Sequence, residues 1–331
     1  MLTVAQIGVG YWGPNLLRNL VASKRCRVKT AVDLFGERRE YVRKLYPGIQ
    51  VTDRTDTIFH DSDITAVVIA TPVSTHYDLA TRALKAGKHV LVEKPLATSV
   101  REVEEIGGLA QEMNLVAMVG HTFLFSPPVR YVKGLIDSGS LGDIRYIYSQ
   151  RLNLGRIRSD VDALWNFAPH DISIIQYWLG DPAPLSVVKR GMAYIQEQVA
   201  DVVFLNILYP NKIIANIHVS WLDPRRVRSM TVVGTKKMVV YDDTVDNKVA
   251  IYDKGIDQEA VHHQHIDYDE KYSPSFHERS GDLILPKIDS QEPLRVEIDH
   301  FLDCILNGAH CITGPEHAKK VVQILSSTEQ A

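Results

Sequence analysis

Residues 3–22 read TVAQIGVGYWGPNLLRNLVA, and this stretch decides the fold of the first part of the chain. An apolar run that predicts a β-strand leads directly into Gly8-Val9-Gly10-Tyr11-Trp12-Gly13, and a predicted helix follows. The pattern G-x-G-x-x-G between a strand and a helix is typical of a dinucleotide-binding turn. Gly8 permits the tight turn, Gly10 lets the backbone approach a pyrophosphate, and Gly13 allows the helix to pack closely on the strand. We therefore predict a cofactor contact along the whole turn, including Tyr11 and Trp12.

An acidic residue ends the next predicted strand and indicates which dinucleotide binds. Asp33 closes the predicted β run Arg27–Asp33, where a carboxylate can accept hydrogen bonds from the adenine ribose hydroxyls. The same carboxylate repels the 2′-phosphate of NADP, so we predict NAD as the cofactor. Arg38 and Arg39 lie close enough in sequence to pair with such a phosphate, which leaves NADP as the alternative.

The alternation of elements predicts the fold class. Up to about Gly120, continuous apolar runs alternate with amphipathic helical patterns, which is typical of a parallel sheet covered on both faces. From Leu185 to Tyr252 several β runs follow one another directly, which indicates a mostly antiparallel sheet. The chain is thus predicted as α/β, with an N-terminal Rossmann domain (residues 1–122) and a C-terminal α+β domain with a large open sheet (residues 123–331). Residues 262–286 are predicted as an irregular surface loop, and we expect the C-terminal helix to pack back on the first domain.

Two segments at predicted strand ends suggest where chemistry occurs. Glu93-Lys94-Pro95 follows one strand, and Thr71-Pro72, with His76 shortly after, follows the strand before it. Ligands of doubly wound sheets bind beyond the carboxyl ends of the strands, so both segments are predicted to border the cofactor.

The fingerprint, the strand order and Glu93-Lys94-Pro95 together resemble the Gfo/Idh/MocA family of two-domain NAD(P)-dependent oxidoreductases, and the resemblance spans essentially the whole chain. It implies that Lys94 contacts both cofactor and substrate. The family also carries a D-x-x-x-H pattern, which His170 completes here. Asn166 stands at the place of the aspartate and departs from the family pattern, because an amide can orient a hydroxyl but cannot ionise.

The resemblance predicts a mechanism with two catalytic residues. Oxidation of a secondary alcohol releases a hydride to the nicotinamide and a proton to a base. An imidazole titrates near neutral pH, so we predict His170 as the general acid/base. Lys94 is predicted to hold the hydroxyl and to stabilise the developing alkoxide. The two roles could be exchanged, since a desolvated lysine can also act as a base.

The substrate prediction rests on the segment before His170. Guanidinium groups pair well with phosphates, and the residues predicted to contact substrate are Arg151, Asn153, Arg156, Arg158, Trp165 and Asn166. This segment, and His121 beside the predicted nicotinamide position, resemble a family branch that oxidises UDP-linked sugars. The implied reaction is oxidation of UDP-N-acetylglucosamine at C3 to the 3-keto sugar, in surface polysaccharide or lipid A sugar biosynthesis. The alternatives are a dehydrogenase or ketoreductase for another sugar or polyol, such as a UDP-sugar uronic acid or inositol, and a non-catalytic NAD-binding regulator.

Composition limits the partners. The 331 residues carry a net charge of −3, which gives no electrostatic case for nucleic acid or an anionic membrane. We see no secretory signal and no span long enough to cross a bilayer, and therefore expect a cytoplasmic protein. The resemblance implies a homodimer or homotetramer that uses the open sheet face.

No metal ion is expected. Cys26, Cys304 and Cys311 have no histidine at a spacing typical of zinc sites and are interpreted as ordinary thiols. The cluster His262, His263 and His265 lacks an acid or cysteine at ligand spacing.

Overall fold

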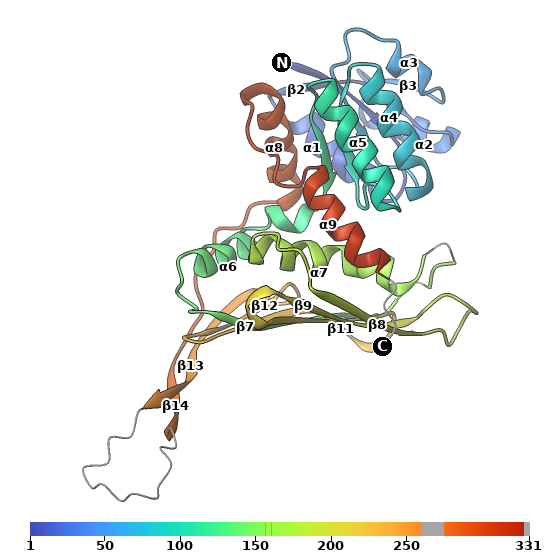
Figure 1. Ribbon diagram of the computed structural model, residues 1–331. Coiled ribbons are helices and arrows are strands. Elements are labelled where there is room, and N and C mark those ends of the chain that lie inside the picture. Colours follow the sequence, from blue (N-terminus) through green and yellow to red (C-terminus); the bar gives the residue numbers. More distant parts are fainter. Residues whose placement is uncertain (156, 160, 260–274, 328–331) are drawn as a thin grey trace, which may run out of the picture. The chain divides into compact units, whose positions relative to one another are not determined.

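A six-stranded parallel sheet carries the dinucleotide-binding turn in the computed structural model, which describes residues 1–155, 157–159, 161–259 and 275–327 (Figure 1). Its strands run in the order β3 (Gln50–Thr52), β2 (Cys26–Val32), β1 (Leu2–Ile7), β4 (Ala66–Ile69), β5 (His89–Glu93) and β6 (Ala117–Gly120). Every residue of β4 and β6 is buried, as expected for strands covered on both faces. The strand order reverses between β1 and β4, which places the crevice for a ligand at the carboxyl end of β1.

Helices connect these strands. They are α1 (Gly13–Ala22), α2 (Gly36–Leu45), α3 (Asp56–Phe59), α4 (His76–Lys85) and α5 (Val100–Glu112), with short 3₁₀ turns at η1 (Val73–Thr75) and η2 (Thr122–Phe125). Ser99 caps α5 in a capping box with Glu102, which satisfies main-chain N–H groups at the start of the helix.

The end of the chain returns to this first unit, which comprises residues 1–127, 172–181 and 290–327. Helices α8 (Pro293–Asn307) and α9 (Pro315–Ser326) bury Phe301 and Leu325 completely. Between them, the carbonyl of Thr313 accepts a hydrogen bond of 2.9 Å from Val119 N on β6. The last helices therefore complete the Rossmann unit and protect its outermost strand. The boundary at residue 122 that the sequence suggests between two domains stays a prediction.

An eight-stranded sheet forms the second unit, which includes residues 128–171 and 182–289. Its order is β14 (Ser275–Ile284), β13 (Val249–Glu259), β12 (Met238–Asp242), β11 (Leu222–Gly234), β7 (Ile144–Leu154), β10 (Ile213–Ser220), β9 (Val202–Tyr209) and β8 (Ser186–Met192). Only β7 and β10 pair in parallel among these described strands. The turn η3 (Pro210–Lys212) joins β9 to β10. This parallel Rossmann sheet and mostly antiparallel second sheet confirm the predicted fold class.

Alternation along the strands gives the second sheet two different faces. Val203, Leu205 and Ile207 are fully or almost fully buried on the face covered by α6 (Pro127–Asp137) and the first half of α7 (Ala163–Leu179) (Figure 1). Phe204 and Leu208 alternate with these residues along β9 and are 45% and 40% exposed on the opposite face. We call the helix-covered side the inner face and the other the open face.

One prediction about this unit is wrong. Residues 275–284, expected to be part of an irregular loop, form β14 and pair antiparallel with β13. The described part of the strand is largely exposed, so its sequence lacks the apolar alternation that indicates a half-buried strand.

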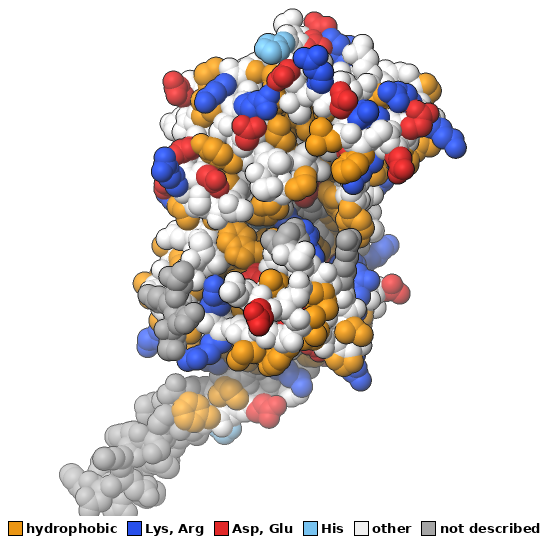
Figure 2. Space-filling model, turned by 90° about the vertical axis from the view of Figure 1, so that its right-hand side faces the viewer, with side chains coloured by type: hydrophobic (Ala, Val, Ile, Leu, Met, Phe, Trp, Pro, Cys, Tyr) orange, Lys and Arg blue, Asp and Glu red, His pale blue; other side chains and the backbone are white. Residues whose placement is uncertain are grey.

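The surface carries mixed charge. Figure 2 shows lysine and arginine side chains interspersed with aspartate and glutamate over the face in view. Within the described residues, no helix combines the length and the apolar character that a bilayer crossing requires.

Candidate active site

The glycine-rich turn has the shape that a dinucleotide requires. Gly8 has a φ of +94°, and a Cβ built on it would lie 2.4 Å from the carbonyl oxygen of Ala70. A Cβ on Gly13 would lie 2.4 Å from the carbonyl oxygen of Gly8, so only glycine lets α1 begin this close to β1. The resulting helix N-terminus offers main-chain N–H groups to phosphate oxygens. These residues fit a bound NAD, which they would hold through its pyrophosphate.

A buried glutamine holds this turn through hydrogen bonds, a role that the sequence analysis did not predict. Gln6 on β1 is fully buried, and its Nε2 donates to the carbonyl oxygens of Gly8 (2.9 Å) and Gly13 (2.8 Å). The signal was available, because a polar side chain inside an otherwise apolar buried strand needs a partner.

Asp33 lies directly against the turn. Its Oδ2 accepts from Val9 N at 2.8 Å and faces Arg38 Nη1 at 3.4 Å, while its Oδ1 accepts from Phe35 N at 2.9 Å. A carboxylate has about four lone-pair positions, so one remains for a ribose hydroxyl. A hollow of about 260 Å³ beside the turn is lined by Val9, Pro14, Glu37, Arg38 and Tyr41. The contact between Asp33 and an adenine ribose stays a prediction.

The turn also contacts the segment that carries Lys94. The side chain of Trp12 lies beside Glu93, the last residue of β5, and acts to lower its pKa, while Glu93 Oε2 accepts from Lys94 N at 3.3 Å. Desolvation raises the pKa of Glu93 to about 7, although the nearby ammonium of Lys94 acts in the opposite direction. The predicted cofactor turn and the predicted catalytic lysine are therefore neighbours in the first unit. Tyr11, by contrast, is 97% exposed.

His76 joins two strand ends. The ring is 1% exposed, with Nδ1 2.8 Å from the carbonyl oxygen of Pro95 and Nε2 2.9 Å from that of Thr71. Burial lowers the pKa of His76. Thr71 also receives a hydrogen bond from Thr75. This geometry gives His76 a positioning role for the loop after Lys94, and its predicted cofactor contact stays a prediction, as does that of Pro72.

Two buried histidines follow β6. The rings of His121 and His317 pack edge to face with centroids 5.4 Å apart, and His317 Nδ1 lies 3.0 Å from Asp181 Oδ1. Burial, and then the neighbouring charges of His317 and Lys94, hold the pKa of His121 well below its usual value. His121 is therefore a neutral imidazole near neutral pH.

A second buried carboxyl lies near Glu93. Glu297 on α8 is fully buried and accepts a hydrogen bond of 2.7 Å from Thr122 Oγ1. Burial, together with the charge of Glu93, raises the pKa of Glu297 well above its ordinary value. Sequence analysis missed this residue, because one glutamate in an amphipathic helix resembles any solvated charge.

The second unit holds the other predicted residues. Asp162 precedes α7 and accepts from Trp165 N at 2.8 Å, which fixes the first turn of the helix that carries Asn166 and His170. Pro169 lies inside this helix, one residue before His170. Trp165, Asn166 and His170 are all partly exposed.

Arg151 makes a buried ion pair. Its Nε donates to Asp171 Oδ2 at 2.8 Å and its Nη2 to Asp171 Oδ1 at 3.2 Å, and Ser149 Oγ donates to the same carboxylate at 2.8 Å. The side chains of Arg151 and Asp171 are only 6% and 1% exposed. This places Arg151 on the inner face, where it anchors α7 to β7. The predicted substrate contact of Arg151 stays a prediction, but two donors of its guanidinium already serve Asp171.

Two of the remaining predicted residues, Asn153 and Arg158, are described by the structure. Asn153 lies near the end of β7, and the carbonyl of Arg158 accepts from Gln196 Nε2 at 2.9 Å. Arg156 and the histidines 262, 263 and 265 lie outside the described residues.

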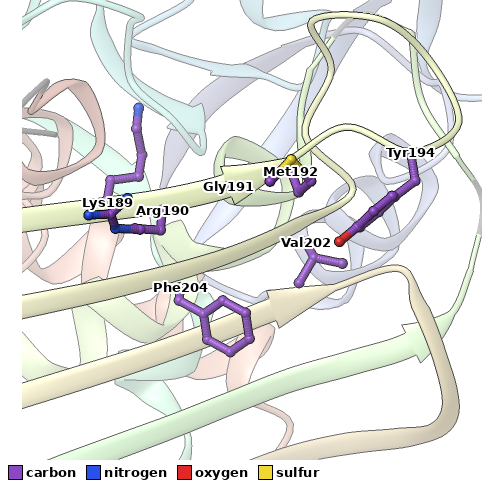
Figure 3. Close-up of a pocket in the computed structure, with 7 residues that line it drawn as sticks. All are labelled: Lys189, Arg190, Gly191, Met192, Tyr194, Val202 and Phe204. Carbon is purple, nitrogen blue, oxygen red and sulfur yellow. The ribbon is translucent and has the colours of Figure 1, made fainter. Parts of the chain in front are cut away.

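A shallow hollow lies at one edge of the second sheet. It measures about 370 Å³ and is lined by Lys189, Arg190, Gly191, Met192, Tyr194, Val202 and Phe204 (Figure 3). Phe204 and Lys189 point to opposite sides of the sheet in this view. None of the predicted site residues lines it, so we do not assign it to the active site.

Relatives share this architecture. UDP-N-acetylglucosamine 3-dehydrogenase from Acidithiobacillus ferrooxidans is 27% identical over 250 residues, which cover 75% of this chain and 76% of that protein. Its solved structure superposes with a TM-score of 0.80 over 98% of this chain and 95% of the other, at 23% identity. GenD2 from gentamicin A biosynthesis, solved in complex with NAD, gives a TM-score of 0.79 at 23% identity over 98% of this chain and 92% of its own. The scyllo-inositol 2-dehydrogenase (NADP(+)) IolW of Bacillus subtilis is 31% identical, over 40% of this chain and 36% of its own length.

Family models match both units. A model described as an oxidoreductase family with an NAD-binding Rossmann fold matches residues 2–121. A model of the GFO/IDH/MocA C-terminal domain matches residues 129–240. Together these matches span well over half of the chain, and the protein belongs to the Gfo/Idh/MocA family of NAD-binding oxidoreductases.

Proposed function

We propose that this protein oxidises a nucleotide-linked sugar, with UDP-N-acetylglucosamine and its C3 hydroxyl as the best candidate. The observation that carries the proposal is the contact between Trp12 of the dinucleotide-binding turn and Glu93, which precedes Lys94. A cation beside the cofactor can hold an alcohol and stabilise it as an alkoxide. The choice of sugar is supported by the relative from A. ferrooxidans, which covers three quarters of the chain.

Lys94 and His170 have separate roles in the proposed reaction. NAD supplies a hydride acceptor when it is bound. Lys94 donates a hydrogen bond to the reacting hydroxyl oxygen and stabilises the negative charge that develops there. His170 accepts the hydroxyl proton as general base. His121, held neutral by burial, adds no positive charge to the nicotinamide region.

The decisive experiment is an assay of NADH formation with a panel of UDP-sugars, free sugars and inositols. We expect turnover of UDP-N-acetylglucosamine and a product that mass spectrometry shows to lack two hydrogen atoms. Turnover of inositol or free glucose alone would support the alternative of a polyol or sugar dehydrogenase. The partial similarity to the B. subtilis inositol dehydrogenase favours this alternative. Binding of NAD without turnover of any substrate would support a non-catalytic regulator.

The residue assignment is tested in the same assay. His170→Ala is expected to lower kcat by about 10²- to 10⁴-fold while NAD still binds, because only the proton acceptor is lost. The exposed His60 provides the matched control, and His60→Ala should leave kcat unchanged. Near-normal turnover of His170→Ala would reject the assignment, and a larger loss in Lys94→Arg than in His170→Ala would indicate exchanged roles.

We further propose a homodimer or homotetramer assembled through the open face of the second sheet. Five large hydrophobic side chains lie exposed there: Tyr146, Tyr148, Phe204, Leu208 and Ile214. Few charged residues lie on the same face of strands β7, β9 and β10, which carry these side chains. Phe204 stacks on His218 there, with ring centroids 4.2 Å apart. An apolar sheet face of this extent favours burial against another protein surface.

A further inference from the structure

Two cysteines that the sequence led us to interpret as ordinary thiols converge with a histidine in the first unit. His300 and Cys304 lie one turn apart on α8, so their side chains share one face of the helix. Gly308 ends α8 with a φ of +64°, and the chain turns so that Cys311 returns to the same place. One nitrogen of His300 and the sulfurs of Cys304 and Cys311 all lie within 4.8 Å of one another.

We propose that His300, Cys304 and Cys311 form a binding site for a thiophilic divalent cation, with Zn²⁺ as the most suitable ion. Two thiolates and one imidazole are ligands that Zn²⁺ prefers, and a water molecule would complete a tetrahedral set. Two thiolates also neutralise the charge of the cation. On binding, the two thiols lose their protons to solvent, and no electrons are transferred.

The distances fit tetrahedral coordination. With a Zn–S bond of about 2.3 Å and a Zn–N bond of about 2.1 Å, a sulfur and a nitrogen in tetrahedral coordination are about 3.6 Å apart. His300 Nε2 and Cys304 Sγ are 3.5 Å apart. Only small side-chain shifts are therefore needed to bring the three donors around one ion.

The hydrogen bonds identify the nitrogen that would coordinate. Ile312 N donates to His300 Nε2 at 3.3 Å, so this nitrogen carries the ring's lone pair, which the main-chain N–H occupies. A main-chain bond of this length is weaker than the usual contact near 2.9 Å, and a metal ion can replace it. Cys304 is 5% exposed and the other two residues are half-buried, which leaves access for the ion.

The location indicates a structural role. Cys311 Sγ lies 4.0 Å from the carbonyl oxygen of Ala117 on β6, and the next residues pair with that strand through Thr313. A bound ion would tie this loop to α8 and so hold the outermost strand of the Rossmann sheet. We expect metal binding to stabilise the first unit without supplying a group to the hydride transfer.

The test uses the full-length protein, reduced and freed of metal, and titrated with Cd²⁺ and with Zn²⁺. We expect one equivalent of Cd²⁺ to produce the ultraviolet charge-transfer absorption of thiolate ligands, and Zn²⁺ to raise the temperature of unfolding. Cys304→Ser and Cys311→Ser should each weaken binding by about 100-fold or more, since even outer partners of metal ligands contribute about 10- to 100-fold. Cys26, a buried thiol whose Sγ donates to the carbonyl of Leu20, is the matched control, and Cys26→Ser should bind normally.

Three results would overturn the proposal. The first is no binding at one equivalent, and the second is unchanged binding in both Cys304→Ser and Cys311→Ser. The third is a disulfide between Cys304 and Cys311 that persists in reducing buffer, detected by mass spectrometry after alkylation. Should a cysteine variant fail to fold, His300→Gln carries the test, because it removes one ligand from a half-buried position and should weaken Cd²⁺ binding by about tenfold or more.

Discussion

Asp33 combines two tasks in one carboxylate. It accepts main-chain hydrogen bonds from Val9 and Phe35, which shape the cofactor turn, and it stands beside the guanidinium of Arg38. A change at this position therefore affects both the shape of the turn and its charge. Asparagine keeps one acceptor oxygen and removes the negative charge, which separates the two effects.

We predict that Asp33→Asn shifts cofactor preference toward NADP. Without the carboxylate, a 2′-phosphate is no longer repelled and can pair with Arg38. The ratio of kcat/KM for NAD to that for NADP should fall by about tenfold or more, which corresponds to about 1.4 kcal/mol. Asp63→Asn, in an exposed pair with Lys29, serves as the control. An unchanged ratio would show that Asp33 does not select the cofactor.

Glu93 predicts a pH dependence of stability. Its pKa is raised by desolvation from an ordinary 4.5 to about 7 in the folded state. Between these values the folded protein binds more protons than the unfolded chain, so the free energy of unfolding falls as pH rises from about 4.5 to about 7. Glu93→Gln cannot ionise, and its stability should decline less over this window.

Denaturant unfolding of wild type and Glu93→Gln at several pH values measures the effect. The stability difference between the two should change in favour of the variant as pH rises through the window. Glu112→Gln, at an exposed position on α5, should keep the wild-type profile. Parallel profiles for wild type and Glu93→Gln would contradict the raised pKa.

At the scale of elements, the ion pair of Arg151 and Asp171 fastens α7 to the inner face of the second sheet. We predict that Arg151→Ala destabilises the protein by about 3 to 5 kcal/mol, because it leaves the buried carboxylate of Asp171 without its positively charged partner. Chemical denaturation measures this loss, and Arg158→Ala, at a partly exposed position, should cost much less. If Arg151→Ala unfolds like wild type and instead raises KM for a UDP-sugar, Arg151 contacts substrate as the sequence first suggests.

Elements differed in how well their sequences predicted them. The first β-α-β unit was predictable, because the glycine pattern and buried apolar strands carry a strong local signal. Strand β14 was not predictable, since its largely exposed sequence has no hydrophobic alternation that indicates a strand. At the site, the glycines, Asp33 and Lys94 follow from the pattern of strand ends. Gln6 could have been assigned, because a polar side chain in a buried strand needs a partner nearby. Glu297 could not, because its partner Thr122 is distant in sequence.

The whole molecule raises the question of assembly. We predict that Phe204→Glu combined with Tyr148→Glu converts the oligomer to a monomer, because it places two charges on the open face where partner side chains would pack. Light scattering coupled to size-exclusion chromatography measures the mass. Val245→Glu, at another exposed apolar position in the second unit, should keep the oligomer. A wild-type mass near that of the 37.2 kDa chain would reject assembly altogether.

The return of residues 290–327 to the first unit has a consequence for biosynthesis. A ribosome releases the six strands of the Rossmann sheet before the second sheet, but α8 and α9 emerge only after the second sheet has been made. Until then β6 has an unprotected edge, and the apolar surfaces that will receive Phe301 and Leu325 stay open to water. The first unit of the nascent chain therefore stays incomplete while the whole second sheet is synthesised. A premature stop after the second sheet would yield a product that keeps the entire glycine-rich turn and is still a target for chaperones and proteases.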